Sequence, residues 1–192
     1  MSDPFFAPEE FVGERFLLRT YRCGDGKALS EAASSSYEHL RPWMPWAVPE
    51  QSITVSETLC RRFCANYLTN VDFVIGIWDG ETLVGGTGFH LKGGSIEGGT
   101  VEIGMWIRHS YAGQGAGTIA LQHMLEWGFT EWGWQRLVWR CDTRNKGSAR
   151  VAEKCGLVLE GTMRSDALDN DGKRRSTHIY AILREDWEAS RK

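Results

Sequence analysis

Hydrophobic residues recur along the first part of the chain at the spacings of strands and helices. The segment 14–21 (ERFLLRTY) predicts a strand, and the segment 24–40 (GDGKALSEAASSSYEHL) predicts a helix. A second helix is expected to begin at Ser52 or Ser56, either of which can cap it. The polar opening segment 1–12 contains two prolines, and we expect it to form a loosely held arm.

The middle of the chain predicts strands followed by a helix. Residues 72–91 contain two apolar stretches joined at Asp79-Gly80, a dipeptide typical of a hairpin turn. A glycine-rich loop then leads to a strand at 100–108 (TVEIGMWIR). The next helix is amphipathic. Its apolar positions are Leu121, Met124, Leu125 and Trp132, and its polar positions are Gln122, His123, Glu126 and Thr130.

The last third predicts a strand at 136–142, a short helix from about 147 to 155 ended by Gly156, and a hairpin over 157–183 around the turn DNDG. These elements predict one mixed α/β (α+β) domain over 1–192, with a central, largely antiparallel twisted sheet flanked by helices. A doubly wound dinucleotide-binding fold does not fit, because strands and helices do not alternate regularly.

Composition narrows the classes of function. The 192 residues carry 22 basic and 25 acidic side chains, a net charge of −3, and no basic block, so we expect no nucleic-acid partner. No apolar stretch approaches the roughly 20 residues that span a bilayer, and the start lacks a signal-peptide pattern. The five cysteines are scattered and complete no metal site, which favours reduced thiols in a cytoplasmic protein.

Two segments suggest binding. The stretch 111–129 (YAGQGAGTIALQHMLEWGF) places three glycines directly before a helix, whose unpaired N–H groups and partial positive charge suit a phosphate. A glycine-rich turn without a ligand fits this pattern equally well. The loop 41–52 (RPWMPWAVPEQS) combines three prolines with Trp43 and Trp46. Because apolar loops are unfavourable when exposed, these tryptophans cover core, line a cleft or form a dimer contact.

Four motifs occur in an order that resembles the GNAT superfamily of acyl-CoA-dependent N-acetyltransferases. They are the strand VEIGMWI, the loop AGQGAGT, the segment NKGS from Asn145 to Ser148, and ARVAEKCGLVLEG. The segments HLRPWMPWA and DGKRRSTHIYAILREDW resemble the RimJ/RimL branch, which includes ribosomal-protein N-terminal acetyltransferases. The resemblance covers nearly the whole chain. It departs at Ala112, where the superfamily often has Gln or Arg, and at Ala152, where many members have Tyr.

The resemblance implies that acetyl-CoA is the acyl donor and that no metal is needed. Backbone N–H groups from 113 to 118 are expected to bind its pyrophosphate, while the strand backbone at 105–107 and one Asn side chain bind its pantetheine arm. The implied cofactor-binding residues are Met105, Trp106, Ile107, Gly113, Gln114, Gly115, Ala116, Gly117, Thr118 and Asn145. A helix cap is a nearly equal alternative for Asn145. Arg144 and Arg150 are further candidates to reach cofactor phosphates.

The resemblance also implies catalytic residues. Ser148 is expected to protonate or hydrogen-bond the leaving thiolate, since Ala152 cannot donate a proton. Glu102 matches a position where some members keep a general base for the amine. The alternatives are a capping role for Ser148 and an ordering role for Glu102. A backbone N–H near Met105 or Trp106, beside a bulge, is expected to stabilise the oxyanion.

On the acceptor side the resemblance points to Trp43 and Trp46, and to Asp166 as a second candidate for the base after Glu102. His90, on the preceding strand, is a third candidate on this side, and it also fits a hydrogen-bonded sheet histidine. The expected acceptor is a primary amine, foremost a protein N-terminal α-amine of the ribosomal type. A small-molecule amine such as an aminoglycoside, a polyamine or an amino-acid conjugate, and an acyl group larger than acetyl, remain open. So does a non-catalytic acyl-CoA sensor, which the two alanines favour. Many relatives dimerise, so a homodimer is a further expectation.

Overall fold

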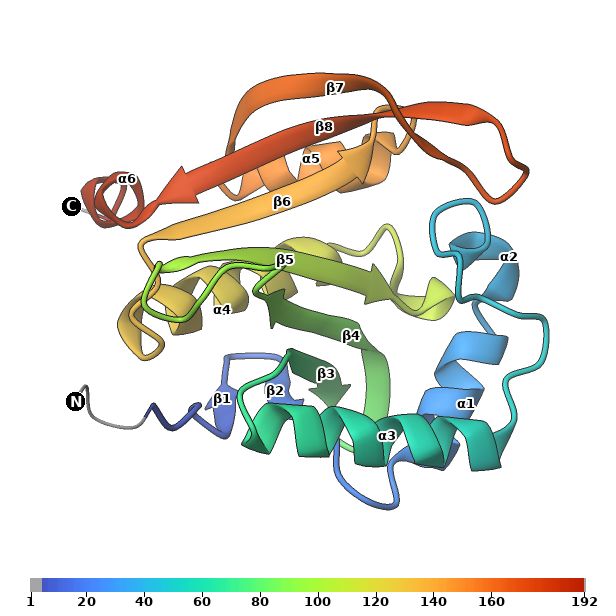
Figure 1. Cartoon of the computed structure of the whole chain (residues 1–192). Coiled ribbons are helices and arrows are strands. Elements are labelled where there is room, and N and C mark those ends of the chain that lie inside the picture. The colour runs from blue at the N-terminus through green and yellow to red at the C-terminus, as the bar shows by residue number, and fades with distance from the viewer. Residues whose placement is uncertain (1–4, 192) are drawn as a thin grey trace.

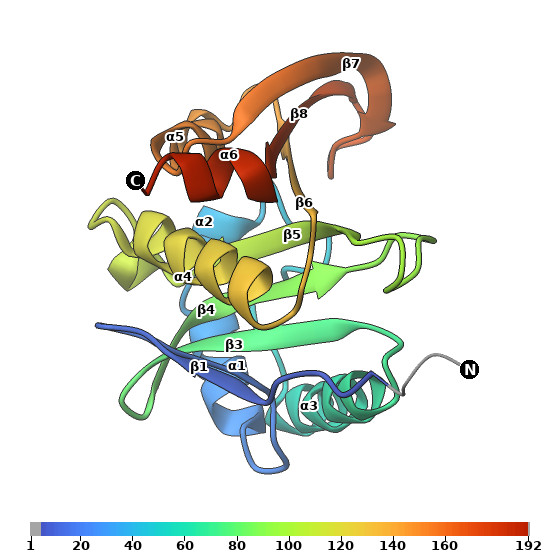
Figure 2. The same cartoon turned by 90° about the vertical axis from the view of Figure 1, so that its left-hand side faces the viewer.

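The computed structural model describes residues 5–191, which form an open eight-stranded sheet with helices on both faces (Figures 1 and 2). The strand order is β1-β2-β3-β4-β5-β6-β8-β7, and β5–β6 is the parallel pair in an otherwise antiparallel sheet. This confirms the predicted fold class. The strands are β1 (Glu10–Val12), β2 (Leu17–Thr20), β3 (Phe73–Asp79), β4 (Thr82–His90), β5 (Thr100–Ile107), β6 (Arg136–Asp142), β7 (Val158–Leu168) and β8 (Arg174–Leu183). The helices are α1 (Gly26–Ser34), α2 (Tyr37–Leu40), α3 (Ile53–Leu68), α4 (Ala116–Thr130), α5 (Lys146–Lys154) and α6 (Arg184–Ala189).

Local sequence signals fixed several element ends as predicted. Gly80, at φ +57°, makes the turn between β3 and β4. Ser52, and not Ser56, caps α3, because its Oγ accepts a hydrogen bond from Val55 N over 3.5 Å. Gly156 follows α5 at φ +82°, the left-handed conformation typical of a helix terminator.

The single helix predicted over 24–40 is instead two helices, α1 and α2, separated at Ser36. Ser36 Oγ accepts a hydrogen bond from His109 N over 2.9 Å, and Ser34 Oγ accepts one from Gln51 N over 2.8 Å. The break therefore coincides with two contacts to distant backbone groups, which the local pattern does not contain.

The N-terminal segment differs from the loose arm expected for 1–12. β1 pairs with β2, Phe5 packs against the main core, and the Phe11 ring lies 5.6 Å from that of His123. This contact also corrects the prediction for α4. His123 was expected on the polar face but is 9% exposed, and its burial lowers the pKa of the imidazole. The first four residues lie outside the described part of the chain.

Both faces of the sheet are packed (Figure 2). Helices α4 and α5 cover one face, where Trp127, Trp132 and Trp139 are buried. Helices α1 and α3 cover the other face around a smaller cluster that includes Tyr21 and Trp78. None of the helices in the described range is long and apolar enough to cross a membrane.

Strands β5 and β6 pair only over their first halves, from Thr100 to Ile103 of β5. Beyond that point β5 continues along β4 and β6 continues along β8, so the two halves of the sheet part toward the right of Figure 1. The β4–β5 register is unbroken through Met105 and Trp106. The opening is therefore a divergence of two strands, and the bulge expected at these residues is not formed.

Candidate active site

A cleft of about 1650 Å³ occupies the opening between β5 and β6. One wall is made by the starts of α4 and α5, and the opposite wall by the loop 41–52 and the first half of α3. These walls lie on opposite faces of the sheet. The cleft therefore connects the two faces, so a molecule held at α4 can present one end to the other side.

The backbone of β5 offers hydrogen-bonding groups to this opening. Thr87 Oγ1 donates to Gly104 O over 2.8 Å, and Arg108 N donates to Val84 O over 2.7 Å, so residues 104 and 108 turn their polar groups toward β4. Because these directions alternate along a strand, Met105 and Ile107 direct their N–H and C=O groups to the open edge. An extended ligand can pair with that edge as an added strand.

Helix α4 begins without a side-chain cap. Its N-cap is Gly115, at φ +82°, and the first N–H that bonds back belongs to Ile119, which donates to Gly115 O over 3.0 Å. The N–H groups of Ala116, Gly117 and Thr118 therefore remain free for a ligand, and all three residues line the cleft. Together with the helix dipole, this arrangement fits the pyrophosphate of coenzyme A.

At the start of α5, Ser148 and Asn145 are held by hydrogen bonds. Asn145 Oδ1 accepts from Ser148 N over 3.0 Å, so Asn145 caps α5 and keeps its Nδ2 for other partners. Trp139 Nε1 donates to Ser148 Oγ over 3.0 Å. An indole N–H only donates, so the Ser148 hydroxyl proton is left to point elsewhere. Burial raises the pKa of the neighbouring Cys141 thiol, and its hydrogen bond with Ser148 acts in the opposite direction.

On the other face of the opening, Glu102 and His90 lie opposite each other on β5 and β4. The Glu102 carboxylate lies 3.5 Å from Arg140 Nε and 3.8 Å from Lys92 Nζ. His90 Nδ1 lies 2.8 Å from Asp72 Oδ1, just before β3. This part of the cleft therefore carries one carboxylate, two cations and one imidazole, and Asp72 contacts the imidazole from outside the lining.

Aromatic side chains cover the same side. The Trp46 and Trp106 rings pack edge to face with centroids 5.5 Å apart, and Trp43 and Phe63 also line the cleft. Trp106 uses its backbone toward β4, since a Cβ at Gly85 would meet Trp106 O at 2.1 Å. Its indole belongs to this aromatic wall. The Trp106 side chain thus lies on the same side of the cleft as Glu102 and His90, which we call the acceptor space. Its backbone does not face the open edge of β5, where the pantetheine arm was expected to pair.

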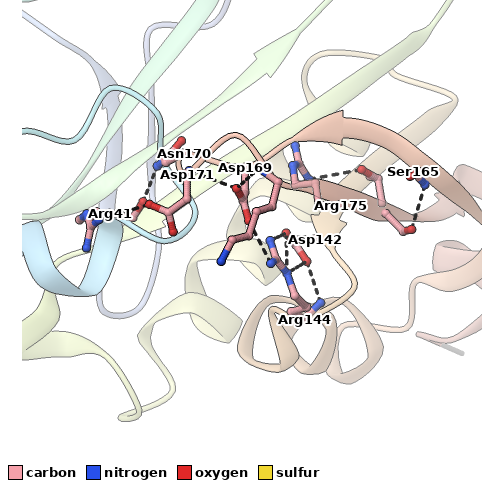
Figure 3. A network of polar contacts seen from close by, with 11 residues as sticks. Arg41, Asp142, Arg144, Ser165, Asp169, Asn170, Asp171 and Arg175 are labelled. Carbon is pink, nitrogen blue, oxygen red and sulfur yellow. Dashed lines mark hydrogen bonds and ion pairs between the residues drawn. The ribbon is translucent and has the colours of Figure 1, made fainter.

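The turn between β7 and β8 lines the cleft through Asp169 and Asn170, and it contacts the segments that follow α2 and β6 (Figure 3). Arg41, which follows α2, lies 3.4 Å from Asp171 Oδ1, and its carbonyl accepts a hydrogen bond from Asn170. Arg144 pairs with Asp142 over 2.7 Å and with Asp169 over 3.1 Å. The hydrogen bonds from Arg144 lower the pKa of the Asp142 carboxyl. Arg144 therefore holds the turn through these ion pairs. The sequence had suggested that Arg144 reaches cofactor phosphates instead.

The family model described as an acetyltransferase (GNAT) domain matches residues 15–158. The chain belongs to the GNAT acetyltransferase family. It is 27% identical over 91% of its length to the uncharacterized N-acetyltransferase YnaD of Bacillus subtilis (strain 168), covering 96% of that protein. It is 35% identical over 44% of its length to the ribosomal-protein-serine acetyltransferase of Escherichia coli (strain K12), covering 46% of that protein.

Solved GNAT structures share the fold. RimL, a ribosomal L7/L12 alpha-N-protein acetyltransferase in complex with coenzyme A, superposes with a TM-score of 0.80 at 20% identity, over 91% of this chain and 98% of RimL. The microcin C7 self-immunity acetyltransferase MccE, in complex with acetyl-CoA and AMP, gives 0.81 at 20% identity, over 93% and 98%. As a GNAT acetyltransferase, the protein uses acetyl-CoA as its acyl donor.

The GNAT cleft brings together the site residues predicted from the sequence, with the exceptions of Gln114 and Arg144. Those that line it are Trp43, Trp46, His90, Glu102, Met105, Trp106, Ile107, Gly113, Gly115, Ala116, Gly117, Thr118, Asn145, Ser148, Arg150 and Asp166. Gln114 does not, and its Nε2 donates to Ser110 O over 2.7 Å. Sequence reasoning missed Asp72 and the donor role of Trp139, because neither belongs to a motif. Within residues 5–191 no cluster of three or more metal-ligating side chains is formed.

Proposed function

We propose that this protein transfers the acetyl group of acetyl-CoA to a primary amine by direct attack within the cleft, most fittingly to the N-terminal α-amine of a protein or peptide. The observation that carries the proposal is the continuity of the cleft. The uncapped start of α4 lies at one wall, and the acidic, aromatic acceptor space lies at the other. A donor held on one face thus meets an acceptor arriving from the other.

On the donor side, the free N–H groups at the start of α4 bind the pyrophosphate. Met105 and Ile107 pair with the pantetheine arm along the open edge of β5, and Asn145 Nδ2 supplies a further hydrogen bond. The Met105 N–H, at the point where the strands part, is then placed to stabilise the oxyanion. Ser148 protonates the leaving thiolate, since Trp139 already donates to its Oγ.

On the acceptor side, the carboxylate of Glu102 draws a protonated amine to the opening and is one candidate to accept its proton, directly or through water. Asp166, on the bulged part of β7, lines the same space. The names of relatives support a ribosomal-protein amine. The wall built from Trp43, Trp46 and Trp106 specifically favours a second candidate, a small-molecule amine with an apolar or aromatic body.

The test is to incubate the purified protein with isotope-labelled acetyl-CoA and a cell extract separated by size. Label in a protein band, assigned by mass spectrometry to an N-terminal residue, is the expected result. Label confined to the small-molecule fraction moves the acceptor to a small amine. If neither fraction is labelled although acetyl-CoA binds, acetyl transfer is wrong and a sensor function replaces it.

A direct assay sharpens the choice. Peptides beginning with Ser, Ala or Met are compared with the same peptides already acetylated at the N-terminus, and with spermidine and an aminoglycoside. The blocked peptides control for lysine acetylation, because only their α-amine is removed. Transfer to free peptides and not to blocked ones is expected. Equal transfer to both sets contradicts the α-amine assignment.

A further inference from the structure

We propose that His90, oriented by Asp72, is the general base that takes the proton from the acceptor amine. The inference rests on the proposed acetyl transfer and names a group which that proposal leaves open. Three groups border the acceptor space and can accept a proton there, Glu102, Asp166 and His90. Their surroundings differ, and the difference favours the histidine.

The first observation is the contact between His90 and Asp72. His90 Nδ1 lies 2.8 Å from Asp72 Oδ1, and the two side chains are 23% and 33% exposed. A carboxylate accepts only, so the shared hydrogen belongs on Nδ1. This fixes the neutral tautomer in which Nε2 carries a lone pair, an arrangement that also holds the ring in one orientation. Asp72 is therefore a positioning residue.

The second observation is where Nε2 lies. A Cβ added at Gly104 would meet His90 Nε2 at 3.0 Å, and one added at Gly88 would meet the ring at 3.0 Å. The imidazole thus extends across the sheet over two glycines. Gly104 directly follows Ile103, the last β5 residue that pairs with β6. Nε2 consequently lies beside the point where the sheet opens and next to Met105, whose N–H faces the gap.

The third observation is the contrast with Glu102. Asp72, before β3, contacts the imidazole, and Glu102 on β5 is the residue opposite His90. Lys92, in the loop after β4, and Arg140 on β6 lie beside Glu102. Glu102 is engaged with both cations, whereas Nε2 has no hydrogen-bond partner within the described chain. An imidazole is also a stronger base than a carboxylate, so it takes a proton from an ammonium more readily. Glu102 then holds the ammonium while His90 deprotonates it.

In the proposed acetyl transfer the acceptor ammonium loses two protons. The ammonium of the acceptor gives one proton to His90 Nε2, which later releases it to solvent. The freed amine nitrogen attacks the thioester carbonyl, so that a C–N bond forms and the C–S bond breaks. Ser148 donates its hydroxyl proton to the departing sulfur. The amine loses its second proton as the amide forms, and this proton restores the Ser148 hydroxyl.

The test measures kcat/KM between pH 6 and pH 9 for the wild-type protein and for His90→Gln. The acceptor is whichever of the peptides and small amines proposed above the wild-type protein acetylates. At pH 7 we expect a loss of about 100-fold or more, with the KM for acetyl-CoA unchanged. Because a free amine needs no base, the deficit should shrink above about pH 8, the range where α-amines deprotonate. His178→Gln is the matched control and should leave kcat/KM unchanged. Like His90, His178 uses its Nδ1 in a contact with a neighbouring strand, 2.8 Å from Thr162 Oγ1, but it does not line the cleft.

Asp72→Asn tests the positioning role. It should lower kcat/KM by about tenfold, and combined with His90→Gln it should cost nothing further, because the two act as a unit. If His90→Gln fails to fold, His90→Ala assayed with added imidazole replaces it, and recovery of rate is expected. A His90→Gln deficit below about twofold, or one that is the same at every pH, overturns the base assignment while acetyl transfer stands. If no amine is acetylated by the wild-type protein, the proposed function fails, and the base fails with it.

Discussion

The hydrogen bond between Trp139 and Ser148 makes the role of Ser148 measurable in two independent ways. Trp139 is 5% exposed, and its Nε1 donates to Ser148 Oγ over 3.0 Å. In Ser148→Ala this buried N–H loses its acceptor, which costs about 1–3 kcal/mol. We therefore expect urea denaturation to show a free energy of unfolding lower by that amount.

The same substitution removes the proposed proton donor. Loss of a positioned acid costs about 10²–10⁴ in rate, so kcat should fall by that factor. The Kd of acetyl-CoA, measured by calorimetry, should stay unchanged, because Ser148 acts on the leaving sulfur and not on the bound pyrophosphate. A fall in kcat without a change in Kd identifies an interaction made only during the reaction.

Trp139→Phe separates the two effects, because it removes the N–H donor while leaving the Ser148 hydroxyl. In that background Ser148→Ala should cost little further stability, yet should still remove most of the remaining kcat. If Ser148→Ala keeps its kcat while losing stability, Ser148 only accepts the indole hydrogen bond. The proton then reaches the sulfur from another group, and the assignment is wrong.

Three further outcomes are expected. Gly115→Ala, at φ +82°, costs about 1–2 kcal/mol of left-handed strain and should weaken coenzyme A binding in calorimetry about tenfold, whereas Gly133→Ala, at φ +76° outside the cleft, should leave it unchanged. The pKa of Asp142 is lowered by Arg144, so this ion pair stabilises the fold above the ordinary Asp pKa of about 3.9 and is lost as the pH falls through the lower folded value. The difference in melting temperature between wild type and Arg144→Gln should therefore vanish in acid, and a difference that persists there would refute the pairing. Trp46→Ala should raise the KM for the acceptor and leave the Kd of acetyl-CoA unchanged, because Trp46 packs on the acceptor side, and the opposite pattern would place it with the donor.

Elements with short-range signals were predicted correctly from the sequence. The turn at Gly80 and the start of α4 after Gly115 depend on glycines in left-handed conformations, and these residue choices can be seen directly. The split between α1 and α2 was not predictable, because Ser36 bonds His109, a residue 73 positions away. Burial of His123 was missed for the same reason, since Phe11 covers it from a distant strand.

In the candidate site, too, residues of local motifs were predicted and features that depend on long-range contacts were missed. Motif residues such as Asn145 and Ser148 line the cleft, because their motif is local and opens helix α5, and their roles stay predictions. The opening itself depends on how far β5 and β6 pair, which the sequence of neither strand records. Asp72 was missed because its value lies only in reaching His90, 18 residues later and on the next strand.

Glycines on β4 and β5 connect the strand pattern to the chemistry. Glycine weakens a strand, so the run LVGGTGFH reads as a poor choice for the centre of a sheet. In the structure a Cβ at Gly86 would meet Trp106 Nε1 at 2.5 Å, and one at Gly88 or Gly104 would meet the His90 ring at 3.0 Å. The missing side chains allow the indole and the imidazole to lie across the strands beside the opening. These strand positions are therefore glycine, in spite of its low strand propensity, because the Trp106 and His90 side chains occupy the space above them. A substitution such as Gly104→Ala should displace the imidazole proposed as the base while leaving its chemical groups unchanged.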